Sequence, residues 1–150
     1  MSDGLIYNKD KAAQKIVMGG KILANNFIIW EKIRRRRGIT PTDIDAFIEY
    51  GDETFIFFEI KEHGKLMDIG QKMAYIRLIN ALKKGGKQSL FIMAWHNRPV
   101  NDEIELSTCM TKYIYYGFGL DLIDVEKRNK TVLFYIEAWE GNRTNMNINI

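Results

Sequence analysis

The sequence has few of the residues that cross-link or interrupt a folded chain, with one cysteine and two prolines among 150 residues. The lone Cys109 excludes a disulfide within the chain and a zinc site made of cysteines alone, and it suits a reducing compartment. The longest apolar runs, 55–58 and 90–95, are far shorter than the ~20 residues that cross a bilayer. The first residues do not resemble a signal peptide. We therefore expect a cytoplasmic protein.

The sequence also lacks the short motifs of several enzyme classes. It contains no G-x-S-x-G nucleophile elbow, no P-loop and no Rossmann glycine pattern. Its two histidines, His63 and His96, match no zinc-binding spacing. These absences argue against a serine hydrolase of that type, a P-loop nucleotide hydrolase, a dinucleotide-binding enzyme and a histidine-based zinc enzyme.

The composition is that of a chain with a substantial core, at 46% hydrophobic and 27% charged residues. Its length fits a single domain, 1–150. The net charge of +3 conceals a strong segregation, because residues 1–42 carry a net +6, residues 43–70 a net −6 and residues 71–150 a net +3. Such a chain could bind a cation in its acidic centre and a polyanion at its basic flanks. Chance segregation in a soluble protein is the alternative.

Hydrophobic periodicity predicts an α/β or α+β fold, with a central mixed β-sheet flanked by helices. In chain order we expect helices over 10–18 and 21–36, strands over 45–50 and 54–61, a helix over 69–84, a strand over 88–95, a helical segment over 102–116, and strands over 119–125 and 131–139. The last four residues of the 102–116 segment also suit a strand. The two C-terminal strands would join across a charged turn at 126–130.

The hairpin formed by the first two strands contains the most informative residues. A two-residue loop at 51–52 would place Asp45 opposite Phe58, whereas a three-residue loop at 51–53 would place it opposite Glu59. Facing Cβ atoms lie ~5 Å apart, which lets two carboxylates share one divalent cation. Lys61 follows on the same face as Glu59, although a surface ion pair at a strand end would explain these two residues equally simply.

Two facing carboxylates repel each other unless a cation or a proton lies between them. Magnesium bound to both would keep coordination positions for water and phosphate. Lys61 could then orient or help to deprotonate the attacking water. The hypothesis of a metal site that holds water and phosphate therefore predicts the three-residue loop.

These residues resemble the PD-(D/E)XK nuclease superfamily over about 21–96, through the order helix, hairpin, helix, strand and the spacing D-x13-E-x-K. Asp45 matches the motif aspartate, and Glu59 and Lys61 match the E-x-K. Gln71 and Tyr75 match the Q-x-x-x-Y of the RecB-type and phage-exonuclease branches, and their spacing puts them on one helix face. The resemblance implies a restriction-endonuclease-like core, with 97–150 as an extension of the same domain.

The resemblance further implies Mg²⁺ held by Asp45 and Glu59, with Mn²⁺ as a substitute. Glu31 is the candidate for the acidic residue that many members contribute from the preceding helix, and a solvated pair with Arg35 is an equally good explanation for it. Two departures from the family pattern concern the motif itself. Pro41 lies four residues before Asp45 rather than next to it, and Asp43 competes with Asp45 as the metal ligand.

The basic run Arg34, Arg35, Arg36 and Arg37 and the helix residue Lys72 are the candidate phosphate contacts. Cations at a helix C-terminus are also favoured by the helix dipole, so a solvated helix end is the alternative for the arginines. We expect a Mg²⁺-dependent deoxyribonuclease, most simply an endonuclease. An RNA-directed nuclease and a non-catalytic nucleic-acid-binding protein on the same fold are the alternatives. A homodimer is a further option, since 150 residues leave little room for a separate recognition domain.

Overall fold

The computed structural model describes residues 44–99 and 102–141. The helices predicted over 10–18 and 21–36 lie outside the described residues. So do Asp43, Glu31 and the four consecutive arginines 34–37.

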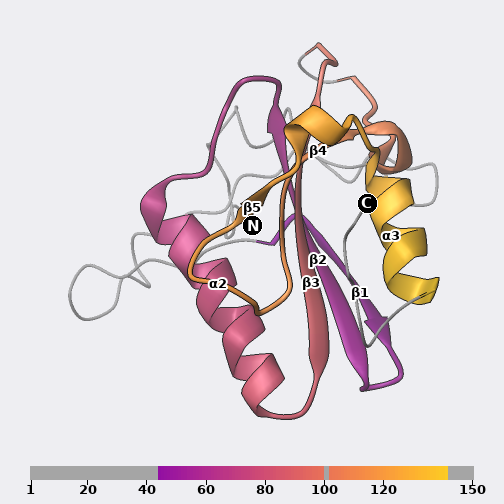
Figure 1. The fold of residues 1–150 in the computed structure, drawn as a ribbon. Helices are drawn as coiled ribbons and strands as arrows, with labels where there is room; N and C mark the ends of the chain where they lie inside the picture. Colours follow the sequence, from indigo (N-terminus) through magenta and orange to yellow (C-terminus); the bar gives the residue numbers. More distant parts are fainter. Residues whose placement is uncertain (1–43, 100–101, 142–150) are drawn as a thin grey trace, which may run out of the picture.

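A mixed five-stranded sheet forms the centre of the described structure (Figure 1). Its spatial order follows the chain: β1 (Ala46–Tyr50), β2 (Thr54–Glu62), β3 (Gln88–His96), β4 (Met110–Tyr115) and β5 (Ile123–Asp124). Strands β2 and β3 pair in parallel, and the other neighbours pair antiparallel. The prediction of a mixed sheet in an α+β protein is confirmed.

Helix α2 (Ile69–Lys84) makes the crossover that the parallel pairing of β2 and β3 requires. It spans the predicted residues 69–84, and it begins after the N-cap Asp68 and ends before Gly85. Its inward residues Tyr75, Ile76 and Ile79 pack on the sheet face formed by side chains such as Phe91. Helix α2 therefore covers the face of the sheet to which the odd-numbered residues of β2 point.

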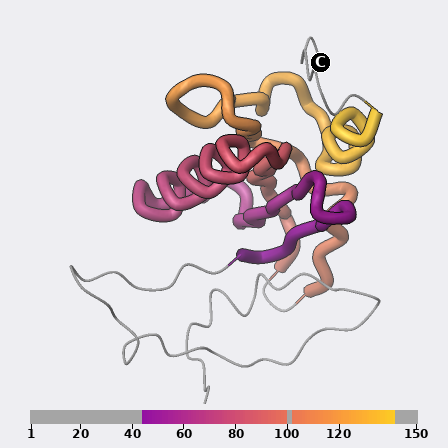
Figure 2. Tube along the Cα trace, turned by 90° about the horizontal axis from the view of Figure 1, so that it is seen from below, coloured from indigo at the N-terminus to yellow at the C-terminus, as the bar shows by residue number. Residues whose placement is uncertain are grey.

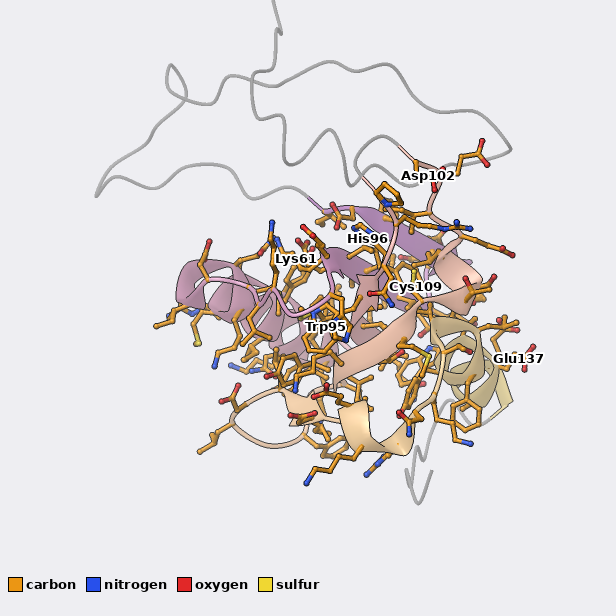
Figure 3. The ribbon with its side chains drawn as sticks, turned by 90° about the horizontal axis from the view of Figure 1, so that it is seen from above. Lys61, Trp95, His96, Asp102, Cys109 and Glu137 are labelled. Atoms are coloured by element: carbon orange, nitrogen blue, oxygen red, sulfur yellow. The ribbon has the colours of Figure 1, made fainter. Side chains whose placement is uncertain are left out.

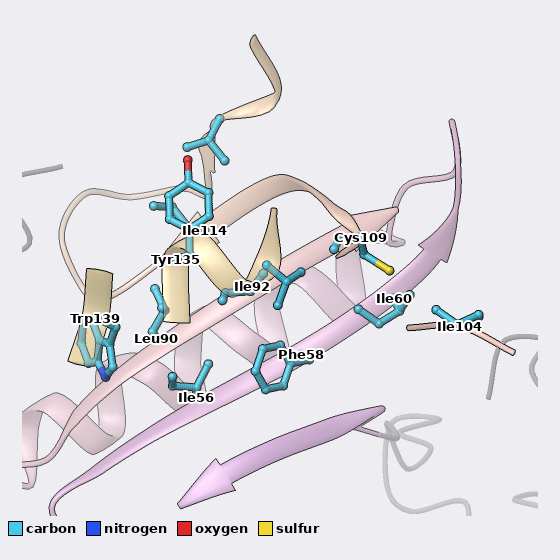
Figure 4. Packing of buried hydrophobic residues seen from close by; sticks show 13 residues of the cluster. Ile56, Phe58, Ile60, Leu90, Ile92, Ile104, Cys109, Ile114, Tyr135 and Trp139 are labelled. Atoms are coloured by element: carbon cyan, nitrogen blue, oxygen red, sulfur yellow. The ribbon is translucent and has the colours of Figure 1, made fainter. Parts of the chain in front are cut away.

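Helix α3 (Val132–Gly141) covers the opposite face (Figures 1 and 2). Its residues Val132, Tyr135 and Trp139 are buried against the even-numbered side chains of β2 and β3, including Phe58 and Ile92 (Figure 4). The prediction of a strand over 131–139 is wrong. The segment is rich in β-branched and aromatic residues, but its buried positions recur with helical spacing, and packing against the sheet overrides the weak β preference.

The prediction of a helical segment over 102–116 is also wrong. A short 3₁₀ turn, η3 (Leu106–Thr108), precedes β4, which contains the first three of the four residues that also suited a strand. Pairing along β3 provides the backbone hydrogen bonds that favour the extended form. Only Ile123–Asp124 of the strand predicted over 119–125 is extended, and η4 (Glu126–Arg128) occupies the predicted charged turn.

Among the described residues, the helices are too short or too polar to traverse a bilayer.

Candidate functional site

The loop between β1 and β2 decides the register of the hairpin. Gly51 and Asp52 both adopt positive φ angles, +57° and +63°, and the N–H of Glu53 donates to the carbonyl oxygen of Tyr50 at 3.1 Å. Tyr50 then pairs with Thr54, and Ala46 pairs with Phe58. The loop therefore has three residues, and the same register continued by one position sets Asp45 opposite Glu59. The two-residue alternative is wrong.

Asp45 lies directly before β1 and is exposed to solvent. Its Oδ2 atom accepts a hydrogen bond from the backbone N–H of Ile60, at 2.7 Å. This bond ties the carboxylate to the residue that follows Glu59 on β2. The two acidic residues are thus held at the same point of the hairpin.

Glu59 is buried, with 3% of its surface exposed, although it carries a carboxylate. Its Oε1 atom lies 2.8 Å from the Nζ atom of Lys61, and its Oε2 atom accepts a hydrogen bond from the hydroxyl of Tyr75 at 2.9 Å. Burial of a charge is costly unless the charge is paired and hydrogen-bonded. Both carboxylate oxygens meet that condition.

The first turns of α2 bring Tyr75 to Glu59. The N-cap Asp68 accepts a hydrogen bond from the N–H of Gln71 at 2.7 Å, which fixes the start of the helix. Gln71 and Tyr75 are both buried, so the predicted shared helix face points toward the sheet. The ring of Tyr75 stacks on Phe91 of β3 with the ring centroids 4.1 Å apart. Tyr75 is therefore positioned by packing as well as by its hydrogen bond.

Lys72, the predicted nucleic-acid contact that falls within the described residues, lies on the same helix. Its Nζ atom forms an ion pair with Asp121 at 3.1 Å, and a third of its side chain remains exposed. Lys72 is therefore accessible but already paired.

A metal ion at this site would depend on two protein carboxylates. Over 44–99 and 102–141, no three or more His, Cys, Asp or Glu side chains are grouped so that they could hold a metal ion. Magnesium is commonly bound through only one or two carboxylates, with water and phosphate as the remaining ligands. An ionised carboxylate offers about four lone-pair positions, so the observed single contact at each oxygen of Glu59 leaves capacity for a ligand bond. The chemistry of Asp45 and Glu59 fits Mg²⁺.

The sequence did not indicate that aromatic side chains would flank Lys61. Trp95 is its partner in the parallel pairing of β2 and β3, and the ring of His63 lies 4.7 Å from the indole between centroids. The indole Nε1 donates to the carbonyl oxygen of Lys65 at 2.7 Å. Figure 3 shows Lys61 and Trp95 toward the α2 side, and His96 toward Cys109 on the other side. Only the register between two distant strands could have revealed this neighbour.

Comparisons with known proteins found no match among protein-family models, curated proteins or solved structures.

Proposed function

We propose that this protein is a divalent-metal-dependent nuclease that hydrolyses phosphodiester bonds in DNA, most simply as an endonuclease on a restriction-endonuclease-like core. The observation that carries the proposal is the three-residue hairpin loop, because its register aligns Asp45 with Glu59 and Lys61. An exposed carboxylate, a buried carboxylate and an ammonium group within one short hairpin are groups that could hold a metal ion and orient water for hydrolysis of a phosphate ester.

Asp45 and Glu59 would hold the Mg²⁺ ion, and Mn²⁺ would substitute for it. When bound, such an ion polarises a phosphoryl oxygen and stabilises the negative charge that develops during hydrolysis. The hydrogen bond from Ile60 to Asp45 supports this assignment, because it holds the Asp45 carboxylate beside the residue that follows Glu59 on β2. The exposure of Asp45 leaves this side of the site open to substrate.

Lys61 has two roles in the proposed mechanism. Its ammonium group neutralises Glu59 in the absence of other cations, which explains how the carboxylate remains buried. The side chain is still 17% exposed, so its remaining donors can orient a water molecule for attack on the phosphorus. With a cation on Glu59, Lys61 would no longer be needed to neutralise that carboxylate and would be available for this water.

Tyr75 and Gln71 act as positioning residues. The Tyr75 hydroxyl holds one oxygen of Glu59 and thereby fixes the direction of the carboxylate. Gln71 lies one turn earlier on the buried helix face, close to the N-terminus of α2. Glu31 is a further acidic candidate from the N-terminal segment.

The charge distribution supports a nucleic acid as the substrate. The net −6 of residues 43–70 includes both proposed metal ligands, so a bound cation would offset part of it. The basic residues Arg34, Arg35, Arg36 and Arg37 and Lys72 would contact the phosphate backbone. These groups recognise phosphates rather than the sugar, so RNA is the competing substrate.

The decisive experiment compares cleavage of circular, linear and single-stranded DNA and of RNA, with Mg²⁺, with Mn²⁺ and with a chelator. Cleavage of circular DNA would identify endonuclease action. We expect Asp45→Asn, Glu59→Gln and Lys61→Ala each to reduce the metal-dependent rate by about 100-fold or more. Glu62→Gln is the matched control, since Glu62 is an exposed carboxylate on the same strand and should leave the rate unchanged.

Full activity in the Asp45 or Lys61 variant would refute the catalytic assignment. Calorimetric titration with Mg²⁺ and Mn²⁺ separates the proposal from the alternative of a non-catalytic nucleic-acid-binding protein. The nuclease should bind the metal in a way that Asp45→Asn weakens. A binding protein without a metal site should show no such heat.

A further inference from the structure

A small cavity of about 160 Å³ opens on the sheet face covered by α2. One wall consists of Leu66, Met67 and Ile69, from the segment that leads into α2. The opposite wall consists of Tyr113 and Leu122. Leu66 and Ile69 are 57% and 77% exposed, so two large apolar side chains lie mostly in solvent at the mouth of the cavity.

The cavity lies beside the proposed nuclease site. Glu59 pairs with Met93 on β3, and Met93 pairs with Tyr113 on β4, so the three residues form one row across the sheet. Two strand spacings correspond to about 10 Å between the backbones at Glu59 and Tyr113. The same helix that carries Gln71 and Tyr75 also contributes Ile69 and Lys72 to the cavity. A nucleotide next to the cleaved bond could therefore reach it.

The polar groups at the cavity suit the edge of a nucleobase. Lys72 and Asp121 both line it and contact each other, with Nζ 3.1 Å from Oδ1. The backbone N–H of Leu122 and the Lys72 ammonium group hold the pKa of Asp121 below its ordinary value. Asp121 therefore remains an acceptor for an exocyclic amino group, while Lys72 can donate to a base carbonyl or a phosphate.

The segment between β4 and β5, which contributes to the far wall of the cavity, is held to α2 near both of its ends. In addition to the Lys72–Asp121 pair, the Nζ atom of Lys83 donates to the carbonyl oxygen of Gly117 at 2.9 Å. The hydroxyl of Tyr115 lies 2.7 Å from Oδ1 of Asn80. Figure 2 shows this orange segment running beside the magenta helix. A wall that is ordered in advance reduces the entropic cost of binding.

We infer that this cavity is a subsite for an unpaired nucleobase adjacent to the cleaved phosphodiester. An aromatic ring and aliphatic side chains stack with or enclose a base, and the charged pair at the mouth contacts its hydrogen-bonding edge. The inference rests on the proposed function and specifies its substrate class. The preferred DNA carries unpaired nucleotides at the cleavage point, as in a single strand, a flap or a frayed end.

The test measures binding of the full chain to a short single-stranded oligonucleotide. It then measures binding to a series of the same oligonucleotide in which a single base is missing, at a different position in each. Ca²⁺ replaces Mg²⁺, and a gel verifies that the DNA stays intact. We expect one abasic position to weaken binding about tenfold. The intact oligonucleotide should also shift the methyl NMR signals of Leu66, Ile69 and Leu122.

The double variant Leu66→Ser, Ile69→Ser removes two exposed apolar side chains from one wall of the cavity without introducing charge, so it should fold. Its DNA binding should no longer depend on the base. Leu133→Ser is the matched control, because Leu133 is an exposed leucine on α3, on the other face of the sheet, and should keep that dependence. Equal binding of intact and abasic DNA by the unmodified chain would overturn the inference. Methyl signals that do not shift would also overturn it, and they are the result expected if the cavity receives an apolar side chain of a protein partner. If binding depends on the base but the protein does not cleave DNA with Mg²⁺, the proposed function is refuted and the subsite remains supported.

Discussion

Two buried polar side chains near the carboxyl ends of β2 and β3 are satisfied to different degrees. Glu59 has a partner at each carboxylate oxygen. His96 is 6% exposed, and its Nδ1 atom accepts a hydrogen bond from the N–H of Arg98 at 3.2 Å. A neutral imidazole then carries its proton on Nε2, and within the described part of the chain that atom has no hydrogen-bond partner. The surroundings of His96 therefore do not stabilise its charged form.

We therefore predict that His96 makes the free energy of unfolding depend on pH. Burial lowers its pKa from the ordinary value of 6.5, more strongly than the neighbouring Glu62 raises it, and Lys65 lowers it further. Below about pH 6.5 the unfolded chain binds a proton that the folded chain does not, so the free energy of unfolding should decrease as the pH falls. Urea unfolding at pH 7.5, 6.5 and 5.5 measures this slope.

The variant His96→Gln should show a smaller loss of stability over the same pH range, whatever its absolute stability. The lowered pKa of Asp124, caused first by its hydrogen bond from Lys112, affects stability only near and below its ordinary value of 3.8. It therefore does not contribute between pH 7.5 and 5.5. Equal slopes for the original chain and the variant would contradict the assignment to His96.

At the scale of single elements, the hairpin and helix α2 form because local signals agree with their tertiary surroundings. Each of the strands β1, β2 and β3 differs from its expected range by a single residue at one end; the expected ranges are 45–50, 54–61 and 88–95. Helix α2 spans the expected residues 69–84. Turn glycines and regular periodicity mark these elements. The segment 131–139 carries conflicting signals, with β-forming residue types at helical spacing, and there the packing of α3 on the sheet decided the outcome.

Helix α2 should depend measurably on its N-cap. Asp68→Ala removes the acceptor for the N–H of Gln71 and should lower the free energy of unfolding by about 1 kcal/mol. Asp68→Asn retains a capping oxygen and is the matched control, with a loss of only a few tenths of a kcal/mol expected. Urea unfolding of the three proteins measures the effect, and equal losses in both variants would show that the cap contributes nothing through hydrogen bonding.

At the scale of the whole molecule, the sheet concentrates acidic residues at the hairpin, while the N-terminal segment carries an excess of basic residues in the sequence. A single figure of +3 describes neither region. For a protein that binds a polyanion, the distribution matters more than the sum, because each contacted phosphate releases counterions.

Replacing Arg34, Arg35, Arg36 and Arg37 by glutamine should weaken DNA binding most strongly at low salt. Each arginine that contacts a phosphate contributes about 0.9 to the slope of log affinity against log salt concentration on duplex DNA. The quadruple variant should therefore reduce the slope by up to about 4. Lys127→Gln is the control, since Lys127 lies in η4, away from the N-terminal segment in sequence, and should leave the slope unchanged. An unchanged slope in the quadruple variant would mean that the arginines form only a solvated helix end.

The sequence by itself determined the elements between Asp45 and Trp95 and the polar side chains along them, because turn residues and periodicity act over a few neighbouring residues. It also limited the hairpin to two registers, and the positive φ angles of Gly51 and Asp52 selected the one that aligns Asp45 with Glu59. Only the tertiary structure decided that Tyr75 holds Glu59, that Trp95 lies beside Lys61 and that 131–139 is a helix. These outcomes depend on contacts between residues far apart in the chain, and no local pattern encodes which distant surface a segment will meet.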